Sequence, residues 1–334
     1  MPSNGKKHVR RDGHADGNGN GNGNGNGKPK GSRAAAGRRR GRGIVTTSAR
    51  PGRGDDSPAK GTLIIIGGHE DKKGDKVILR LIADRVGSGK LVVATVASQV
   101  PQDVWKDYEP IFHELGVKKV VHLDVASREE AKSPEKLKLL DNAAGIFFTG
   151  GDQLKLTSQL GDSPIYERLR EIYRDGGLVA GTSAGASVVC ETMLVGGAGE
   201  ESHEVGTSLR MAPGFGLIPG VIIDQHFAQR GRIGRLVAAV AQNPRMLGVG
   251  IDEDTAILCE PKGGCFRVVG SGAVYVVDGQ DVSYTNLTDE AEDRILSVFG
   301  VRLHLLSMGD EYDLATRVPT DHPAEEMEEE LVGA

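Results

Sequence analysis

The chain has 334 residues, of which 38% are hydrophobic, and its formal net charge is −5 at pH 7. This length is enough to bury one sizeable hydrophobic core. The longest apolar runs fall well short of the roughly twenty residues that a transmembrane helix needs, so the composition excludes a membrane-spanning protein.

The first sixty residues predict a disordered tail. A Gly-Asn repeat at residues 17–27 and a basic cluster at residues 38–42 lack any periodic apolar pattern. Residues 1–60 carry 14 Lys and Arg against 4 Asp and Glu, a net charge of +10, whereas the rest of the chain has a net charge of −15. Such a tail either solvates the protein or binds nucleic acid or another anionic surface through salt-sensitive contacts. Its basic start is not followed by a hydrophobic stretch, so we expect no secretory signal and a cytoplasmic protein.

From residue 61 the pattern alternates between strand and helix and predicts one domain over residues 61–310. In chain order, the expected elements are strand 62–66, helix 75–86, strand 91–94, helix 102–115, strand 119–123, strand 144–148 and helical residues 154–174. This alternation is typical of an α/β fold with a mainly parallel sheet flanked by helices. The sequence Gly-Gly-His-Glu at residues 67–70 is expected to be an ordinary turn after the first strand, rather than the rim of a pocket.

The sequence Gly-Thr-Ser-Ala-Gly at residues 181–185 lies between two apolar runs. It has the layout of a nucleophile elbow, in which a serine occupies a sharp turn from a strand into a helix. Flanking glycines supply the small volume that the turn needs, and the helix N-terminus directs its N–H groups towards the serine hydroxyl. Ser183 is therefore the candidate nucleophile. The alternative is a tight turn in which Ser183 only caps the helix.

A serine nucleophile needs a base and a third group that orients this base. His226 follows the apolar residues 222–223 at an expected strand end, and the acidic triplet Asp252, Glu253 and Asp254 follows the next apolar strand. Strand alternation directs Glu253 to one face and the two aspartates to the other, so any of the three carboxylates is a possible orienting group. The chain order Ser, His, acid differs from the Ser, acid, His order of α/β-hydrolases. A solvated turn is the alternative interpretation of the acidic triplet.

Other segments carry weaker signals. Residues 194–219 predict a long surface loop, in which His203 with its neighbouring glutamates only superficially resembles a metal cluster. Short strands at residues 257–259, 266–269, 274–277 and 301–306 predict an antiparallel extension of the sheet. Residues 311–334 are expected to be an acidic, mobile tail. The three cysteines, Cys190, Cys259 and Cys265, have no metal-ligand spacing and are expected to be reduced, with a Cys259–Cys265 disulfide as an alternative.

Four ordered motifs together resemble cyanophycinase, a serine peptidase family that also includes aspartyl dipeptidases. The motifs are Thr-Gly-Gly-Asp-Gln at residues 149–153, Gly-Thr-Ser-Ala-Gly-Ala at 181–186, Asp-Gln-His-Phe at 224–227 with three arginines after it, and Gly-Ile-Asp-Glu-Asp-Thr at 250–255. The resemblance covers residues 61 to about 308. It implies a flavodoxin-like fold shared with class I glutamine amidotransferases, and hydrolysis of cyanophycin to β-aspartyl-arginine dipeptides. Cyanophycin has an aspartate backbone that carries arginine through isopeptide links.

The resemblance also implies roles for individual residues. Ser183 is similar to the family's nucleophile, His226 to its general base and Glu253 to the acid that orients this base. The backbone N–H groups of Gly151 and Ala184 correspond to an oxyanion hole. The resemblance implies no metal or other cofactor, and a homodimer.

The same resemblance implies substrate-binding residues near the triad. They are Gln153, Asp224, Gln225, Arg230, Arg232 and Arg235, with less support for Asp152. Arginine binds carboxylates bidentately, and the polymer presents arginine cations together with free carboxylates. The three arginines do not share one helix face, so we expect at most two of them to touch the ligand. Their alternative role is a solvated, basic first turn.

Two other functions stay open on the sequence alone. One is a related serine peptidase that acts on short aspartyl or other acidic peptides. The other is a non-catalytic binding module that uses the basic tail on nucleic acid.

Overall fold

The computed structural model describes residues 61–196, 204–205, 209–261, 264–287 and 294–320. The chain divides into two units, residues 1–54 and 55–334, and the described residues all belong to the second unit. The predictions for the tail at residues 1–60 and for His203 therefore concern positions outside the described residues.

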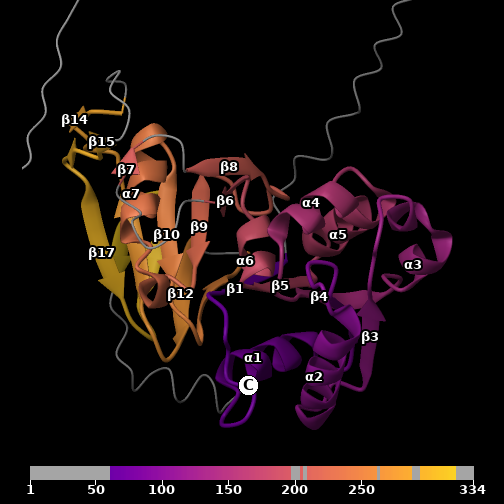
Figure 1. Ribbon diagram of the computed structural model, residues 1–334. Helices are drawn as coiled ribbons and strands as arrows, with labels where there is room; N and C mark the ends of the chain where they lie inside the picture. Colours follow the sequence, from indigo (N-terminus) through magenta and orange to yellow (C-terminus); the bar gives the residue numbers. More distant parts are fainter. Residues whose placement is uncertain (1–60, 197–203, 206–208, 262–263, 288–293, 321–334) are drawn as a thin grey trace, which may run out of the picture. The chain divides into compact units, whose positions relative to one another are not determined.

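A nine-stranded sheet runs through this unit in the strand order β19-β18-β12-β11-β1-β5-β4-β2-β3 (Figure 1). Its parallel part consists of β1 (Thr62–Ile66), β5 (Leu178–Thr182), β4 (Ala143–Phe148), β2 (Lys90–Ala94) and β3 (Lys119–Leu123). Each of the predicted strands in this region agrees with an observed strand to within one residue, and the predicted α/β class is confirmed.

Helices cover both faces of this parallel part (Figure 1). One face carries α1 (Val77–Val86) and α2 (Pro101–Glu114), and the other carries α3 (Pro134–Lys138), α4 (Gln153–Leu160), α5 (Pro164–Arg174) and α6 (Ala184–Val188), with the short 3-10 helix η1 (Glu130–Lys132). Along β1, Leu63 and Ile65 pack in one core cluster, and Ile64 and Ile66 pack in the other. A strand that is buried on both faces reads as a continuous apolar run, which explains the sequence of β1.

A second, four-stranded sheet has the order β17-β13-β10-β9. The strands β9 (Val221–Gln225) and β10 (Leu247–Ile251) are parallel, whereas β13 (Val274–Asp278) and β17 (Arg302–Leu306) are antiparallel to their neighbours. Helix α7 (Ile233–Gln242) packs Leu236 and Val240 against Ile222 of this sheet. The 3-10 helix η2 (Ala228–Arg230) precedes α7.

The antiparallel strands predicted near the C-terminus are present, but they join two different sheets. The large sheet contains β11 (Thr255–Cys259), β12 (Cys265–Gly270), β18 (Glu311–Asp313) and β19 (Val318–Thr320), while β13 and β17 belong to the smaller sheet. Residues 311–320 were expected in the mobile tail, and this boundary is wrong. The ring of Tyr312 is fully buried and stacks on Phe266 with a centroid distance of 5.6 Å, so these residues complete the sheet.

The segment expected to be a long surface loop contains strands. β6 (Thr192–Gly196) pairs with β8 (Arg210–Pro213), and β7 (Glu204–Val205) pairs with β15 (Arg294–Ile295). Met193 and Leu194 of β6 are buried in the core clusters, which explains why this strand packs against the domain. β14 (Tyr284–Thr285) and β16 (Val298–Phe299) form a further antiparallel pair.

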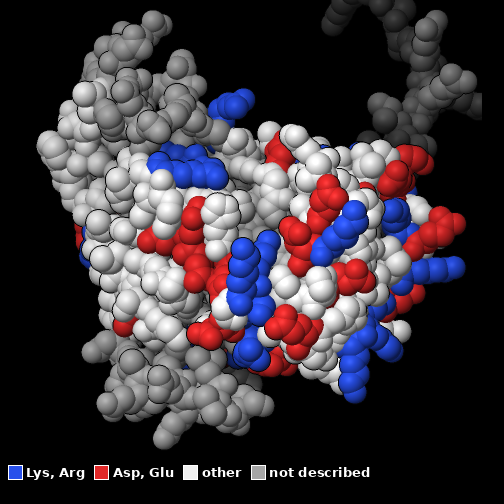
Figure 2. All heavy atoms as spheres, turned by 60° about the horizontal axis from the view of Figure 1, so that its bottom comes forward, with Lys and Arg blue, Asp and Glu red and all other residues white. Residues whose placement is uncertain are grey.

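Other expectations concern the surface and the thiols. No helix in the described part of the chain is both long enough and apolar enough to cross a membrane. Among the residues that Figure 2 draws in colour, acidic and basic side chains are mixed over this face. Cys190, Cys259 and Cys265 are all free thiols, as expected for the reduced state.

Candidate active site

Ser183 occupies a strained turn between β5 and α6. Its backbone has φ 54° and ψ −110°, a conformation that L-residues rarely adopt. A Cβ atom at Gly181 would lie 2.3 Å from the carbonyl oxygen of Gly185, and one at Gly185 would lie 2.3 Å from that of Phe148. The turn therefore requires both glycines. The side chain of Ser183 makes no capping hydrogen bond to α6, which argues against a role as a simple helix cap.

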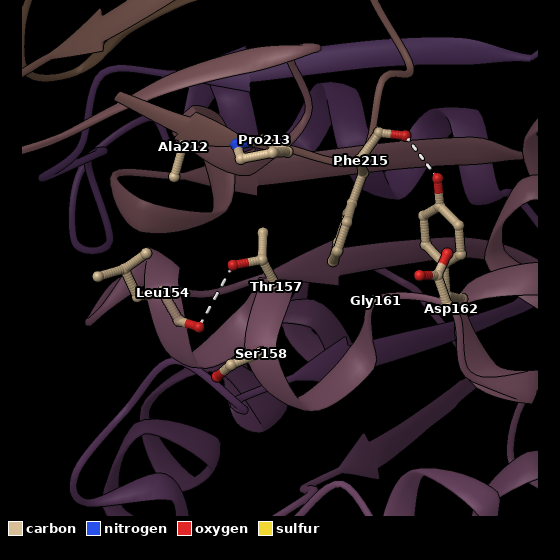
Figure 3. Close-up of a pocket in the computed structure, with 10 residues that line it drawn as sticks. Leu154, Thr157, Ser158, Gly161, Asp162, Ala212, Pro213 and Phe215 are labelled. Carbon is tan, nitrogen blue, oxygen red and sulfur yellow. Dashed lines mark hydrogen bonds between the residues drawn. The ribbon is translucent and has the colours of Figure 1, made fainter. Parts of the chain in front are cut away.

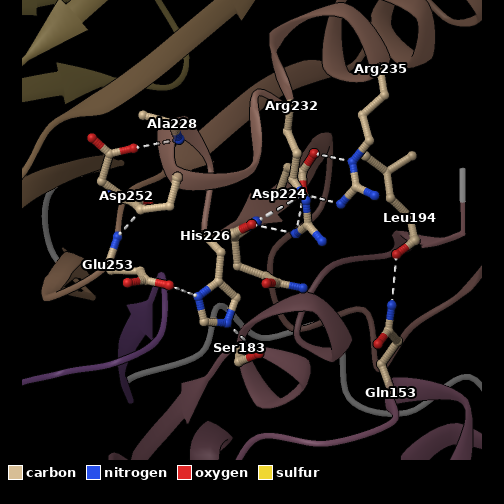
Figure 4. Close-up of polar contacts among 12 residues, drawn as sticks. Gln153, Ser183, Leu194, Asp224, His226, Ala228, Arg232, Arg235, Asp252 and Glu253 are labelled. Atoms are coloured by element: carbon tan, nitrogen blue, oxygen red, sulfur yellow. Dashed lines mark hydrogen bonds and ion pairs between the residues drawn. The ribbon is translucent and has the colours of Figure 1, made fainter. Parts of the chain in front are cut away.

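His226 follows the C-terminal end of β9 and points towards Ser183 (Figure 4). Its Nε2 atom lies 3.0 Å from Oγ of Ser183, and the residue is only 4% exposed. The loop after β1 packs directly on the imidazole, because a Cβ atom at Gly68 would lie 2.2 Å from its Cε1 atom. Backbone and packing thus hold the ring in one position.

Of the three carboxylates in the acidic triplet, Glu253 is the one at His226. Its Oε1 atom lies 2.7 Å from Nδ1 of His226. Asp252 instead accepts a hydrogen bond of 2.8 Å from the backbone N–H of Ala228, at the start of η2. Asp254 accepts one of 2.8 Å from the backbone N–H of Asp71. The two aspartates therefore stabilise loops around the site.

His69 and Glu70, in the loop after β1, were expected to form an ordinary turn, but both make contacts with this site. Nδ1 of His69 lies 2.9 Å from Oε2 of Glu253, so the carboxylate contacts two histidines at once. Glu70 is buried and accepts hydrogen bonds from the hydroxyl groups of Thr182, at 2.5 Å, and of Tyr108. Thr182 directly precedes Ser183, so its hydrogen bond to Glu70 stabilises the turn that carries Ser183.

The ionisation of the pair favours a neutral base beside a charged acid. Burial lowers the pKa of His226, although the hydrogen bond to Glu253 partly opposes this effect. Burial on its own raises the pKa of Glu253, but hydrogen bonds from His69 and His226 outweigh it and leave that pKa lowered. A neutral imidazole that contacts a carboxylate through Nδ1 presents its Nε2 lone pair to the serine hydroxyl.

The two backbone groups expected to form an oxyanion hole belong to Gly151, in the loop after β4, and to Ala184, the first residue of α6. Within the described part of the chain, neither the N–H of Gly151 nor that of Ala184 has a hydrogen-bond acceptor. Gly151 has φ 141°, and a Cβ atom there would lie 2.2 Å from the carbonyl oxygen of Ala97, so only glycine fits this loop. Both donors are available to a developing oxyanion.

A polar cavity of about 490 Å³ opens beside Ser183. Its lining includes all three predicted arginines and two predicted glutamines: Arg230, Arg232, Arg235, Gln153 and Gln225. The expectation that these arginines belong to one helix is wrong. The chain changes from η2 to α7 through Gly231, with φ 58°, which lets all three side chains reach the same cavity.

Asp224 organises two of these arginines (Figure 4). Its side chain is 1% exposed and is paired with Arg232 at 3.2 Å and with Nε of Arg235 at 2.6 Å. Arg230 has no acidic partner within the described residues. The cavity therefore keeps a net positive charge.

The amide groups of the cavity differ in their contacts. Nε2 of Gln153 donates to the carbonyl oxygen of Leu194 at 2.8 Å. Oε1 of Gln225 is buried and has no hydrogen-bond partner among the described residues, so it is an acceptor available to a ligand. Asp152, which had weaker support as a pocket residue, caps α4 by accepting from the N–H of Leu154 at 2.8 Å.

A second cavity, of about 580 Å³, lies between α4, the start of α5 and β8 (Figure 3). Leu154, Pro213 and Phe215 give it a largely apolar lining, and the hydroxyl of Tyr166 donates to the carbonyl oxygen of Phe215 at 2.9 Å. It contains none of the predicted catalytic residues, so the polar cavity is the candidate active site.

Comparisons with known proteins identify the family of the chain. The family model for Peptidase family S51 matches residues 63–264. A cyanophycinase of Trichormus variabilis is 42% identical over 261 residues, which cover 77% of this chain and 87% of that protein. A cyanophycinase of Synechococcus elongatus is 40% identical over 260 residues, 77% of this chain and 80% of that protein.

A solved structure shares the fold. The crystal structure of a peptidase from an acI-B1 Actinobacterium aligns with a TM-score of 0.58 at 22% identity, over 77% of this chain and 98% of that chain. The extent of the family match and the identity to these relatives lead to one conclusion: the chain belongs to peptidase family S51.

Proposed function

We propose that the protein is a serine peptidase that hydrolyses cyanophycin to β-aspartyl-arginine dipeptides. One observation carries this proposal: Ser183, His226 and Glu253 form a continuous chain of contacts of 3.0 Å and 2.7 Å beside an arginine-lined cavity. The 40–42% identity to proteins named cyanophycinase supports the choice of substrate.

The contacts define the order of the proton transfers. His226 accepts the proton of Ser183 through Nε2 while Oγ attacks the carbonyl carbon of the peptide bond. Glu253 accepts a hydrogen bond from Nδ1 and stabilises the imidazolium that forms. The N–H groups of Gly151 and Ala184 donate to the carbonyl oxygen as it becomes negatively charged.

The acyl-enzyme then forms and is hydrolysed in three further proton transfers. His226 gives its proton to the leaving amine, which departs and leaves an ester on Ser183. A water molecule loses a proton to His226 and attacks this ester, and His226 returns that proton to Oγ of Ser183 as the second product leaves. Every step uses groups that already lie around one hydroxyl.

The cavity matches a ligand that carries carboxylates. Arginine linked through its α-amino group keeps a free α-carboxylate. Arg230, which has no acidic partner among the described residues, is suited to bind this carboxylate bidentately. Asp224 fixes the side chains of Arg232 and Arg235, so their positive charge is held in place in the same cavity as Arg230. Oε1 of Gln225, which has no hydrogen-bond partner in the described part of the chain, is suited to accept from an N–H group of the substrate.

The direct test incubates the purified protein with cyanophycin granules and analyses the released material by mass spectrometry. We expect β-aspartyl-arginine as the main product. Release from short aspartyl peptides without release from granules would support a dipeptidase of the same family instead. Inactivity on both, together with no labelling of Ser183 by a serine-reactive probe, would contradict the proposed function.

We further propose a cytoplasmic homodimer. The edge strand β17 exposes Leu303 and Leu305, which are 53% and 64% exposed, and such side chains favour burial against a second copy. Size-exclusion chromatography with light scattering measures the mass of the assembly. Two roles stay open for the basic segment at residues 1–60, a solvating tail and a nucleic-acid contact. A gel-shift comparison of the full chain with a chain lacking these residues distinguishes them.

A further inference from the structure

Three side chains at the candidate active site can reach one point from different segments of the chain. They are His69 from the loop after β1, His226 after β9 and Glu253 after β10, and their ligand atoms all lie within 4.8 Å of one another. In the described part of the chain, no other set of three His, Cys, Asp or Glu side chains meets this condition. We propose that these three residues form a reversible inhibitory site for Zn²⁺, which switches off the peptidase by occupying its base.

The donor set suits zinc. Two imidazole nitrogens and one carboxylate are a common three-residue set for Zn²⁺, with a water molecule as the fourth ligand. Zinc bonds of about 2.0–2.2 Å in tetrahedral geometry place ligand atoms roughly 3.3 Å apart. At present Nδ1 of His226 lies 2.7 Å from Oε1 of Glu253, whereas Nδ1 of His69 lies 2.9 Å from Oε2. The carboxylate thus faces the two imidazoles with different oxygens, and it must turn and draw back by about half an ångström to share one ion with them.

The two outer ligands have room to make this adjustment. The side chain of His69 is 74% exposed and that of Glu253 is 26% exposed, whereas His226 is held by its packing. The rings of His69 and His226 are nearly perpendicular, at 77°, with centroids 5.1 Å apart. Their nitrogens therefore approach the carboxylate from different directions, as a tetrahedral ion requires.

Metal binding requires no net loss of protons from the neutral site. Each neutral imidazole moves its single proton from Nδ1 to Nε2, and each Nδ1 lone pair binds zinc while the carboxylate of Glu253 supplies the negative charge. Nε2 of His226 then carries a hydrogen and donates it to Oγ of Ser183. In this tautomer it cannot accept the serine proton, so the nucleophile is not activated.

His69 completes the zinc site. Without it, zinc would have only the two residues of the catalytic pair, which already hydrogen-bond to each other. Mg²⁺ and Ca²⁺ prefer oxygen ligands, so we expect neither to inhibit. The proposal thus assigns His69 a role separate from substrate hydrolysis.

The test measures zinc directly and needs no cyanophycin. Isothermal titration of Zn²⁺ into the untagged, full-length Ser183→Ala protein measures binding at a site that cannot turn over. The same titration with His69→Ala added should show affinity weaker by more than about tenfold, because even residues behind metal ligands change affinity about 10–100-fold. His113→Ala, which removes another exposed histidine, is the matched control and should leave the affinity unchanged.

A second measurement tests whether bound Zn²⁺ blocks the general base His226. Zinc should slow the labelling of Ser183 by a fluorophosphonate probe, and EDTA should restore the rate. In the His69→Ala protein, zinc should change the labelling rate little from the rate that the same variant shows without zinc. Circular dichroism verifies the fold of this variant. Equal zinc affinity with and without His69, or labelling that zinc leaves unchanged in the wild-type protein, would overturn the proposal. Failure to degrade cyanophycin would not affect either measurement, so the two proposals can fail separately.

Discussion

The Nδ1 atom of His226 lies 2.7 Å from Oε1 of Glu253, although the two residues are 27 positions apart in the sequence. Parallel pairing of β9 with β10 brings them together, since Gln225 is the partner of Ile251 and each functional residue follows shortly after. The pair follows the C-terminal ends of adjacent strands, where α/β proteins commonly place their chemistry.

The contrast between Glu253 and Asp252 gives the first prediction. Glu253→Gln should lower kcat by on the order of 10³-fold or more, because an amide neither favours the correct tautomer nor stabilises the imidazolium. Asp252→Asn should lower kcat by less than about tenfold, because an amide oxygen still accepts from the N–H of Ala228. Steady-state rates of dipeptide release compare the two. A larger loss in the aspartate variant would move the orienting role to Asp252.

Replacing the proposed nucleophile is the second test. Ser183→Ala should lower the rate of hydrolysis by more than about 10³-fold while leaving the fold and the binding of polymer intact. Circular dichroism checks the fold, and co-sedimentation with cyanophycin granules checks binding. Ser158→Ala, at an exposed position of α4, is the control and should remain fully active. Turnover by the Ser183→Ala protein at the wild-type rate would refute the assignment.

The arginines of the cavity should separate into two classes. Arg230→Ala should raise KM by about 10–100-fold with little change in thermal stability, because a charged hydrogen bond contributes about 1.5–3 kcal/mol and Arg230 has no acidic partner among the described residues. Arg235→Ala should lower the free energy of unfolding by about 1–3 kcal/mol, because it leaves the buried carboxylate of Asp224 with fewer partners.

Kinetics and calorimetric unfolding distinguish these classes. If Arg230→Ala destabilised the fold as much as Arg235→Ala and left KM unchanged, Arg230 would be a structural residue.

The pH dependence follows from the lowered pKa of His226. Burial is the main cause, so the base stays neutral at neutral pH and kcat/KM should fall only below the ordinary histidine value of about 6.5. The hydrogen bond to Glu253 raises the pKa of His226, so Glu253→Gln should move the acid limb of its residual activity to still lower pH. The pH profile of kcat/KM on short soluble substrates measures the acid limb of both the wild-type and the Glu253→Gln protein. An acid limb above 6.5 in the wild-type protein would show that another group controls the rate.

The sequence was most informative where local pattern and tertiary structure agree. β1 and β5 are buried on both faces, so their apolar runs and the glycines after them indicate both the strands and the turns that end them. The elbow at Ser183 could be predicted because its two glycines are required by local backbone contacts. The motif resemblance supplied the choice of Glu253, which alternation alone left open among three carboxylates.

Contacts between distant segments could not be predicted in this way. His69 and Glu70 look like turn residues because nothing near them in the sequence shows that Glu253 and Thr182 are their partners. The buried ring of Tyr312 places residues 311–320 in the sheet, although the charge of the following residues suggested a tail. The break at Gly231 directs three arginines into one cavity.

The sequence by itself determined the α/β class and the parallel strands and pointed to the candidate reactive side chains, because burial and turn geometry act through neighbouring residues. Only the tertiary structure decided which carboxylate contacts His226, which arginine is left without an acidic partner among the described residues, and that His69 joins the site. Hydrogen bonds and ion pairs depend on distances of a few ångströms between atoms, and only the packing of separate strands and loops sets those distances.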